Sequence, residues 1–183
     1  MARIINYVGQ LKMKNSDTDI LLDKTEQASK YLLTGTKDFL WSIDPLNDNL
    51  GSLKVHIRDF GDKILSEKGI EFRVYSSIQE DVPLPFGYTR QINLIFKEAF
   101  TNVFKHSQAT SVELHFESKP NKIMISLVDN GIGLYLYKNI IVDGEGSANM
   151  NIRSSKIGAS LEIISKPTGG TTVQLLVDLN EKI

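Results

Sequence analysis

The sequence contains no cysteine, so it can form no disulfide bond, no cysteine-ligated zinc site and no thiol-based active site. Histidine is scarce as well, because only His56, His106 and His115 occur and they are too scattered to form a pair of metal ligands on one helix. No apolar run reaches the roughly 18 residues of a membrane-spanning helix. Polar Asn6 and Gln10 interrupt any signal-peptide core near the start. We therefore expect a soluble protein of intracellular type, located in the cytoplasm.

An excess of basic charge is also missing. Lys and Arg together number 21 and Asp and Glu number 22, so the formal net charge is −1. This balance offers no broad basic surface, and we expect neither nucleic acid nor a membrane as a partner. Hydrophobic residues make up 41% of the 183 residues and charged residues 23%, a composition that indicates a folded globular chain and excludes a wholly disordered one.

The first quarter of the chain has a helical pattern. Apolar residues from Ile20 to Ile43 recur at steps of three and four, with polar residues between them. Polar residues 15–17 separate this stretch from a shorter helical run, and Pro45 ends it because proline disfavours helix at the preceding residue. We predict a helical hairpin within residues 1–45 and a second domain over 46–183. The apolar stripes of the hairpin either pack on the chain's own body or form a two-fold four-helix bundle with a second copy.

The rest of the chain mixes helical and strand patterns. Helices are predicted at residues 50–66, 89–105 and 149–157, and strands at 70–75, 111–117, 123–128, 160–164 and 172–179. Short turns such as Pro120-Asn121-Lys122 and Thr168-Gly169-Gly170 join neighbouring strands. Hairpins interleaved with helices indicate an α+β fold, a two-layer sandwich in which one mixed sheet carries helices on one face.

A group of polar residues is predicted on one helix. Glu98 and Asn102 are four residues apart and Lys105 is three further on, so an α-helix places all three on one face, with His106 beside them. The residues between them are apolar and suit a core. Taken alone, this polar face is better explained by exposure to solvent.

Glycine-containing segments follow at three places. Asp129 ends a strand and is followed by Gly131 and Gly133; alone, this is a hairpin turn, but it also suits a carboxylate at a pocket where glycines let the backbone approach a ring. Gly144 and Gly146 open a helix, whose free N–H groups suit a phosphate, although taken alone this segment is better explained as a plain loop. The last such segment contains Gly170 and Thr171 and is by itself only a turn. The second segment thus contributes Gly144, Gly146 and the adjacent Ser147 as candidate site residues, and the last contributes Gly170 and Thr171.

In this order, the four segments resemble the ATP-binding domain of bacterial sensor histidine kinases, within the superfamily of gyrase, chaperone and mismatch-repair ATPases. The resemblance covers roughly residues 86–179. The N box of that family corresponds to Glu98, Asn102, Lys105 and His106, its first glycine box to Asp129, Gly131 and Gly133, its second to Gly144 and Gly146, and its terminal Gly-Thr to Gly170 and Thr171. A further stretch with Trp41, Pro45, Asp48 and Leu50 is similar to the linker of the nitrate-sensor subfamily.

The resemblance implies a role for each of these residues. Asn102 would coordinate the Mg²⁺ of bound ATP, since magnesium prefers oxygen ligands. Lys105 and His106 would face phosphate charge, and Glu98 would be the general base or the residue that orients the acceptor. Asp129 would accept a hydrogen bond from the adenine amine, supported by Thr171. Residues 134–143 would form a lid over the nucleotide.

The resemblance also implies partners and a reaction. The γ-phosphoryl group would pass to a histidine and then to an aspartate of a response-regulator receiver domain. The N-terminal helices would form a homodimer, and the chain would be the cytoplasmic part of a sensor, with or without a membrane anchor. Alternatives are a non-catalytic dimerisation module with a vestigial nucleotide site, or an ATPase or serine kinase of the same superfamily.

Two features depart from the family pattern. Ser147 stands where the second glycine box usually has leucine, so the packing of the lid is expected to differ. The first predicted helix resembles the region just after the family's phosphoacceptor His-Asp pair, and counting back places that histidine at Met1. We therefore expect a chain that begins after the phosphoacceptor and does not phosphorylate itself.

Overall fold

The computed structural model describes the backbone of residues 16–78, 82–133, 145–165 and 169–180. The chain divides into two compact units, Met1–Asp44 and Pro45–Ile183. Within the described residues, no helix is long and apolar enough to cross a membrane.

The first unit contains helix α2, Ser16–Ile43, which is the longer helix of the predicted hairpin. The shorter helix predicted before it lies outside the described residues. Large apolar side chains of α2 are exposed to solvent in the single chain: Leu32, Phe39, Leu40 and Ile43. An ion pair of 2.8 Å between Lys30 and Glu26, one helical turn apart, lies among its polar residues. The helix ends before Pro45, as predicted from the position of the proline.

The second unit is an α+β domain, which confirms the predicted fold class. Its elements in chain order are η1 (Pro45–Asn47), α3 (Leu50–Ser66), β1 (Glu71–Ser77), α4 (Tyr88–Asn102), η2 (Val103–Ser107), β2 (Ser111–Lys119), β3 (Lys122–Asp129), α5 (Glu145–Ser155), β4 (Ser160–Ser165) and β5 (Thr171–Asp178). Helix α3 has the predicted bounds, because Asn49 caps it by accepting a 2.7 Å hydrogen bond from the backbone N–H of Ser52.

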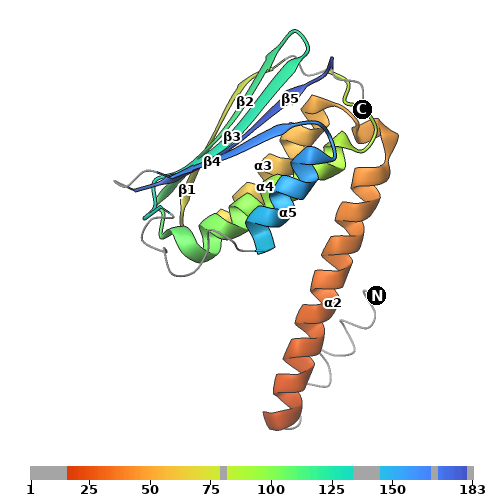
Figure 1. Cartoon of the computed structure of the whole chain (residues 1–183). Helices are drawn as coiled ribbons and strands as arrows, with labels where there is room; N and C mark the ends of the chain where they lie inside the picture. Colours follow the sequence, from red (N-terminus) through yellow and green to blue (C-terminus); the bar gives the residue numbers. More distant parts are fainter. Residues whose placement is uncertain (1–15, 79–81, 134–144, 166–168, 181–183) are drawn as a thin grey trace. The chain divides into compact units, whose positions relative to one another are not determined.

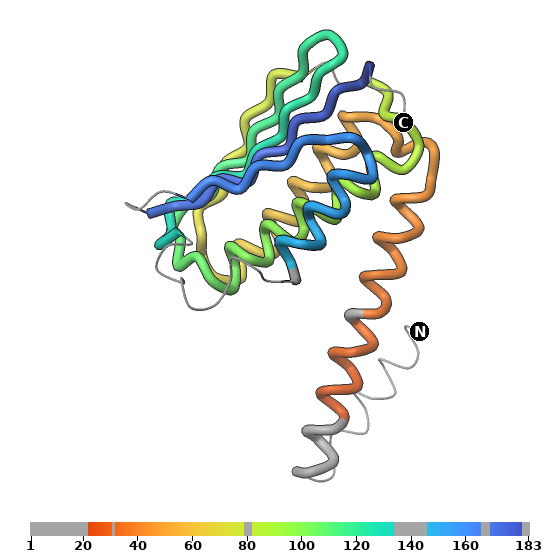
Figure 2. Tube along the Cα trace, viewed as in Figure 1, coloured from red at the N-terminus to blue at the C-terminus, as the bar shows by residue number. Residues whose placement is uncertain are grey.

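The five strands form one mixed sheet in the order β1-β2-β3-β5-β4. β1 pairs with β2 in parallel, and all other neighbours are antiparallel. Helices α3, α4 and α5 cover one face of this sheet, with α4 and α5 side by side (Figures 1 and 2). The register places Asp129, at the end of β3, opposite Thr171, at the start of β5. Two predicted site residues from distant segments thus meet at one edge of the domain.

Aromatic rings join α3 and α4 to the sheet. The ring of Phe100 lies edge-on to those of Phe60 and Phe72, at centroid distances of 6.1 and 5.5 Å. Gly61 faces this cluster, and a β-carbon there would lie 2.6 Å from the Phe100 ring and 2.9 Å from the Phe72 ring. The backbone of α3 therefore approaches α4 as closely as it does only because residue 61 has no side chain.

Two predicted helix boundaries are wrong. The α-helix expected over 89–105 ends at Asn102, and residues 103–107 form a π turn instead. The helix expected from Asn149 begins at Glu145, which brings Gly146 and Ser147 into its first turn. The first N–H groups of a helix have no partner within it, so small residues at this position leave them accessible.

Candidate functional site

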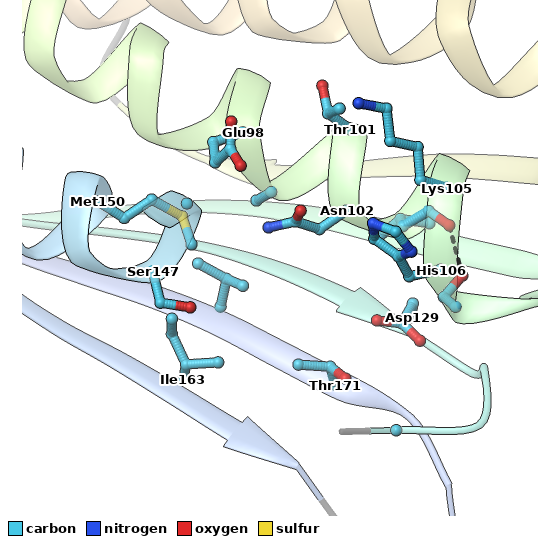
Figure 3. Close-up of a pocket in the computed structure, with 16 residues that line it drawn as sticks. Glu98, Thr101, Asn102, Lys105, His106, Asp129, Ser147, Met150, Ile163 and Thr171 are labelled. Atoms are coloured by element: carbon cyan, nitrogen blue, oxygen red, sulfur yellow. Dashed lines mark hydrogen bonds between the residues drawn. The ribbon is translucent and has the colours of Figure 1, made fainter. Parts of the chain in front are cut away.

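A cavity of about 310 Å³ lies between α4 and α5 above the strands β3, β5 and β4 (Figure 3). It is lined by most of the residues that the sequence selected, namely Glu98, Asn102, Lys105, His106, Asp129, Gly133, Gly146, Ser147 and Thr171. Gly131 lies in the turn that carries Asp129, and Gly170, which directly precedes β5, packs against that turn. Gly144 and the predicted lid, residues 134–143, are outside the described part of the chain.

The carboxylate of Glu98 lies against the first turn of α5. A β-carbon on Gly146 would collide with the nearer oxygen of this carboxylate and would lie 3.2 Å from its carboxyl carbon. Glu98 and Asn102 both face the cavity from α4, one helical turn apart, as the spacing predicted (Figure 3). Glycine at 146 thus makes room for the acidic side chain at the start of a helix, where the helix dipole favours negative charge.

The π turn changes which side chain follows Asn102 on this face. A π turn holds more than four residues, so the residue four positions after Asn102 lies over it and the residue three positions after it is rotated further away. Figure 3 agrees with this geometry: the His106 ring points into the cavity between Asn102 and Asp129, whereas the Lys105 ammonium extends toward the side of Thr101. The predicted single face of Glu98, Asn102 and Lys105 is therefore altered in its last turn.

Asp129 is a buried carboxylate, with 6% of its surface exposed. Burial raises the pKa of its carboxyl group above the ordinary value, while hydrogen bonds from the backbone N–H groups of Gly131 and Thr171 oppose that rise. The bond from Gly131 measures 2.8 Å. The net rise means that the charged form lacks part of the hydrogen bonding that water would give, so it favours a further donor from the cavity.

Asn130 fixes the turn that presents Asp129. Its side-chain oxygen accepts hydrogen bonds from the backbone N–H groups of Thr110 and Ser111 at 2.9 and 3.0 Å, and its amide donates to the Thr110 hydroxyl. The N–H of Ile132 then donates to the carbonyl of Ser107 at 2.8 Å. The turn after β3 is thereby tied to both the start of β2 and the π turn.

Gly131 in this turn and Gly170 just before β5 serve close packing of the backbone. A β-carbon on Gly131 would overlap the Ser107 carbonyl oxygen and lie 2.8 Å from the Asp129 carboxylate. Gly170 has a φ of 83° and its β-carbon would lie 2.5 Å from the Asp129 carbonyl oxygen. These contacts alone explain why both positions are glycine. The approach of a ligand ring, which the sequence suggested, would be a second reason.

The structure also adds residues that sequence reasoning missed. The cavity wall includes a set of apolar side chains, Ala99, Val103, Met150, Ile163 and Val173, together with Thr101. Their apolar spacing on α4, α5, β4 and β5 predicted a buried face, but it gave no sign that this face borders a cavity. An apolar wall opposite one buried carboxylate suits a flat ring with an amino group.

The donor set fits magnesium only together with a phosphate ligand. Among the described residues, no group of three or more His, Cys, Asp and Glu side chains could hold a metal by itself. Asn102 and Glu98 do offer oxygen atoms to the cavity. Magnesium keeps several waters and commonly takes one or two protein oxygens plus substrate phosphates, so these residues fit it as part of a nucleotide complex.

Comparison with known proteins places the chain in a family. Residues 87–181 match the family described as histidine kinase-, DNA gyrase B-, and HSP90-like ATPase. Because the match spans just over half of the chain, the chain belongs to this family.

Among curated relatives, the sensor protein VraS of Staphylococcus aureus (strain COL) is 29% identical over 143 residues, which cover 72% of this chain and 41% of VraS. The chain thus spans about two fifths of the length of this relative. The histidine kinase domain of the Erythrobacter litoralis EL346 blue-light activated histidine kinase has a TM-score of 0.63 at 18% identity, over 97% of this chain and 92% of that one. Full-length ShkA, solved in complex with AMPPNP, has a TM-score of 0.63 at 14% identity, over 95% of this chain and 42% of that one. This chain is similar in fold to both of these solved structures.

Proposed function

We propose that the cavity binds Mg-ATP and that the chain is the catalytic part of a protein-histidine kinase in a two-component system. The observation that carries this proposal is the buried Asp129, which borders a cavity whose other walls bear Asn102, Glu98 and His106. Membership of the ATPase family supports ATP as the ligand, and the complex of ShkA with AMPPNP shows a similar fold holding an ATP analogue.

Asp129 would recognise the adenine. Its carboxylate can accept a hydrogen bond from the exocyclic amine of adenine, whereas guanine presents a carbonyl at the same position. The apolar wall that includes Met150, Ile163 and Val173 would pack against the ring. The Thr171 N–H already donates to Asp129, and its side chain lines the cavity, so it would support this contact.

The opposite part of the cavity would bind the phosphates. Asn102 would hold magnesium, whose charge would neutralise that of the phosphates when it is bound. His106 points into the cavity, and Lys105, an exposed residue on its wall, can swing its long side chain toward the phosphates. The first turn of α5 would offer backbone N–H groups, with Gly146 and the Ser147 hydroxyl facing the cavity and Gly144 preceding them.

Glu98 would act on the group that attacks the γ-phosphorus. A carboxylate near the phosphates can take the proton of the attacking group, or orient that group for attack in line with the leaving oxygen. In this proposal a histidine nitrogen forms the new bond to phosphorus as the bond to the bridging oxygen breaks. The phosphoryl group then passes to an aspartate of a response-regulator receiver domain.

The helices of residues 1–45 would form the homodimer and the histidine-phosphotransfer part, and residues 46–183 the ATP-binding part. The exposed apolar side chains of α2 support this assignment, since a two-fold bundle would cover them.

Sedimentation should detect a dimer that dissociates when Leu32 and Leu40 are changed to Glu, whereas exchange of the ion-paired Lys30 for Gln should leave it intact. A parent chain that stays monomeric at high concentration would count against the dimer.

The function is tested by titration with a fluorescent ATP analogue, with and without Mg²⁺. We expect saturable binding that Mg²⁺ strengthens and that unlabelled ATP, but not GTP, reverses. Equal competition by GTP would refute the role of Asp129 in reading adenine. Absence of any binding would refute the nucleotide site itself and favour a vestigial one.

A further inference from the structure

We infer that Lys68, which lies outside the cavity, is a positioning residue for the proposed nucleotide site: it holds the π turn η2 in the conformation that directs His106 into the cavity. This inference rests on the proposed function for its effect on nucleotide binding. Its structural part, the hold of Lys68 on the turn, stands on the contacts of the described residues alone.

The π turn needs a hydrogen-bond donor from elsewhere. The last carbonyl groups of a helix have no partner within it. In a π turn, the N–H that pairs with the Phe104 carbonyl is that of Ala109. Here the chain leaves the helix at Gln108, which has a left-handed φ of 53°, and the Ala109 N–H binds the Ser107 hydroxyl at 3.0 Å instead. The Phe104 carbonyl is thus released from the helical pattern.

Lys68 meets this need with two contacts to one residue. Its ammonium donates a hydrogen bond to the Phe104 carbonyl and lies 4.3 Å from the centroid of the Phe104 ring. A hydrogen bond from a charged donor together with a cation–π contact is stronger than either alone. Both contacts fix the same residue, in the turn that carries Lys105 and His106.

The backbone of Lys68 is itself held in place. After α3, the N–H of Ile70 donates to the Leu65 carbonyl at 3.2 Å and that of Gly69 to the Ser66 carbonyl at 3.1 Å, with Gly69 at a φ of 66°. This is the closure that commonly ends a helix before a glycine. The side chain of Lys68 therefore leaves the backbone from a fixed point and reaches the π turn across the end of α3.

The opposite side of the π turn is tied to the binding site. The Ser107 carbonyl accepts the N–H of Ile132, three residues after Asp129. The turn is therefore held between Lys68 on one side and the Asp129 turn on the other. Release of the Lys68 side would let the turn relax toward an ordinary α-helix, which would rotate His106 away from its position between Asn102 and Asp129.

The chain offers a matched control. The ammonium of Lys97, on α4, lies 4.8 Å from the centroid of the Phe60 ring, so Lys97 makes the same kind of cation–π contact in the same helical layer. It precedes the π turn by more than one helical turn. Exchange of either lysine for methionine keeps the apolar stem and removes the charge.

The experiment combines the variants K68M, K68R and K97M with two measurements, and the melting temperature of each variant is recorded as a control. The first is the NMR signal of the histidine rings without nucleotide, which is simple because the chain has three histidines and H106N assigns the relevant one. We expect the His106 signal to shift in K68M and to stay at its parental position in K68R and K97M, with His56 and His115 as internal references. The second is affinity for the ATP analogue, which we expect to fall about fivefold in K68M only, a size usual for coupling through neighbouring contacts.

The outcomes separate the two proposals. Parental His106 signals and parental affinity in K68M would overturn the positioning role. Equal losses of melting temperature and affinity in K68M and K97M would overturn it too, because they would show a general structural effect of removing a surface charge. If the parent bound no nucleotide, the proposed function would fail, yet the His106 signal would still decide whether Lys68 holds the turn.

Discussion

Asp129 shows how opposing effects on one residue shape a binding site. Burial disfavours its charge, and two backbone N–H groups restore part of the lost solvation. The hydrogen bond from Gly131 is local, whereas that from Thr171 depends on the pairing of β3 with β5. A carboxylate in this condition gains from one more donor, and an adenine amine provides it. In the empty site, the charged Asp129 carboxylate is therefore incompletely solvated, and a hydrogen bond from the ligand would offset this desolvation.

Asp129→Asn tests this balance through pH. The pKa of Asp129 is raised in the folded state, so its protonated form favours folding. This contribution to the free energy of unfolding is fully present below the unfolded-state pKa of about 3.9 and is lost as pH rises through the folded-state pKa. The melting temperature of the parent should therefore rise relative to that of the variant as pH falls from 7 toward 4, since all other groups cancel in the difference. At pH 7 the variant should lose about a hundredfold in ATP affinity, the cost of a buried hydrogen bond to a charged acceptor. A pH-independent difference in melting temperature would contradict the assignment.

Asn102→Ala tests the proposed magnesium ligand. The amide of Asn102 faces the cavity one turn from Glu98, and its loss should remove a metal contact and leave the adenine contact unchanged. Affinity for the ATP analogue with Mg²⁺ should fall at least about tenfold, the lower end of what changes around a metal ligand cost. With EDTA, the affinity should match that of the parent, and Asn151→Ala, at an exposed position of α5, should change neither value. Equal losses with and without Mg²⁺ would indicate misfolding.

At the level of elements, the packing of α3 against α4 depends on one missing side chain. Gly61→Ala would place a methyl group 2.6 Å from the Phe100 ring and 2.9 Å from the Phe72 ring. Both rings are held by edge-on contacts, so they have little room to move. We expect the free energy of unfolding to fall by about 1–3 kcal/mol, as for other overpacked cores. Calorimetry should show this loss, and Gly35→Ala, where nothing lies within 4 Å of the added carbon, should not destabilise α2.

How far the sequence predicted these elements depends on how local their causes are. The predicted bounds of α3 are confirmed, and their causes are local: the Asn49 side chain caps its start and Gly69 lies just past its end. The mixed sheet follows from alternating apolar residues and turn residues. The π turn could not be predicted, because the residues that hold it are distant in sequence. Lys68 is 36 residues from Phe104, and Ile132 is 25 residues from Ser107, so only the fold brings these pairs together.

The candidate site was predictable to a similar degree. Its polar residues and glycines stand out because their types and order are unusual, and seven of these polar residues and two of the glycines line one cavity. The apolar wall was hidden, since Met150 and Val173 have the same spacing as residues that only fill a core. The orientation of His106 relative to Lys105 was missed for a physical reason: one extra residue in a turn rotates every later side chain, and helical periodicity assumes that no such residue exists.

At the scale of the whole molecule, the three histidines decide what the chain can do with ATP. His56 lies on α3, beneath the sheet, and His106 lies inside the proposed nucleotide site. His115 is on β2, where its ring stacks on Tyr75 at 4.8 Å and its Nε2 lies 3.2 Å from the Glu113 carboxylate. A phosphoacceptor must reach the γ-phosphorus in line with its leaving oxygen, and we expect none of these three side chains, held within the binding domain, to do so.

We therefore predict that this chain binds ATP and does not label itself. Incubation with Mg²⁺ and ATP labelled at the γ-phosphate should leave it unlabelled, because the three histidines belong to the domain that holds the nucleotide and none is on a helix of the other unit in the described residues. The same chain with a His-Asp pair placed ahead of Ile4, on the predicted first helix, should gain a label that acid removes, since phosphohistidine is acid-labile. Glu98→Gln in that extended chain should lower the rate of labelling far more than ATP affinity, as expected for a group that acts on the attacking nitrogen and not on the bound nucleotide. Stable label on the unextended chain would show that one of the three histidines, or a hydroxyl group, is an acceptor after all, and H56N, H106N and H115N would then identify which.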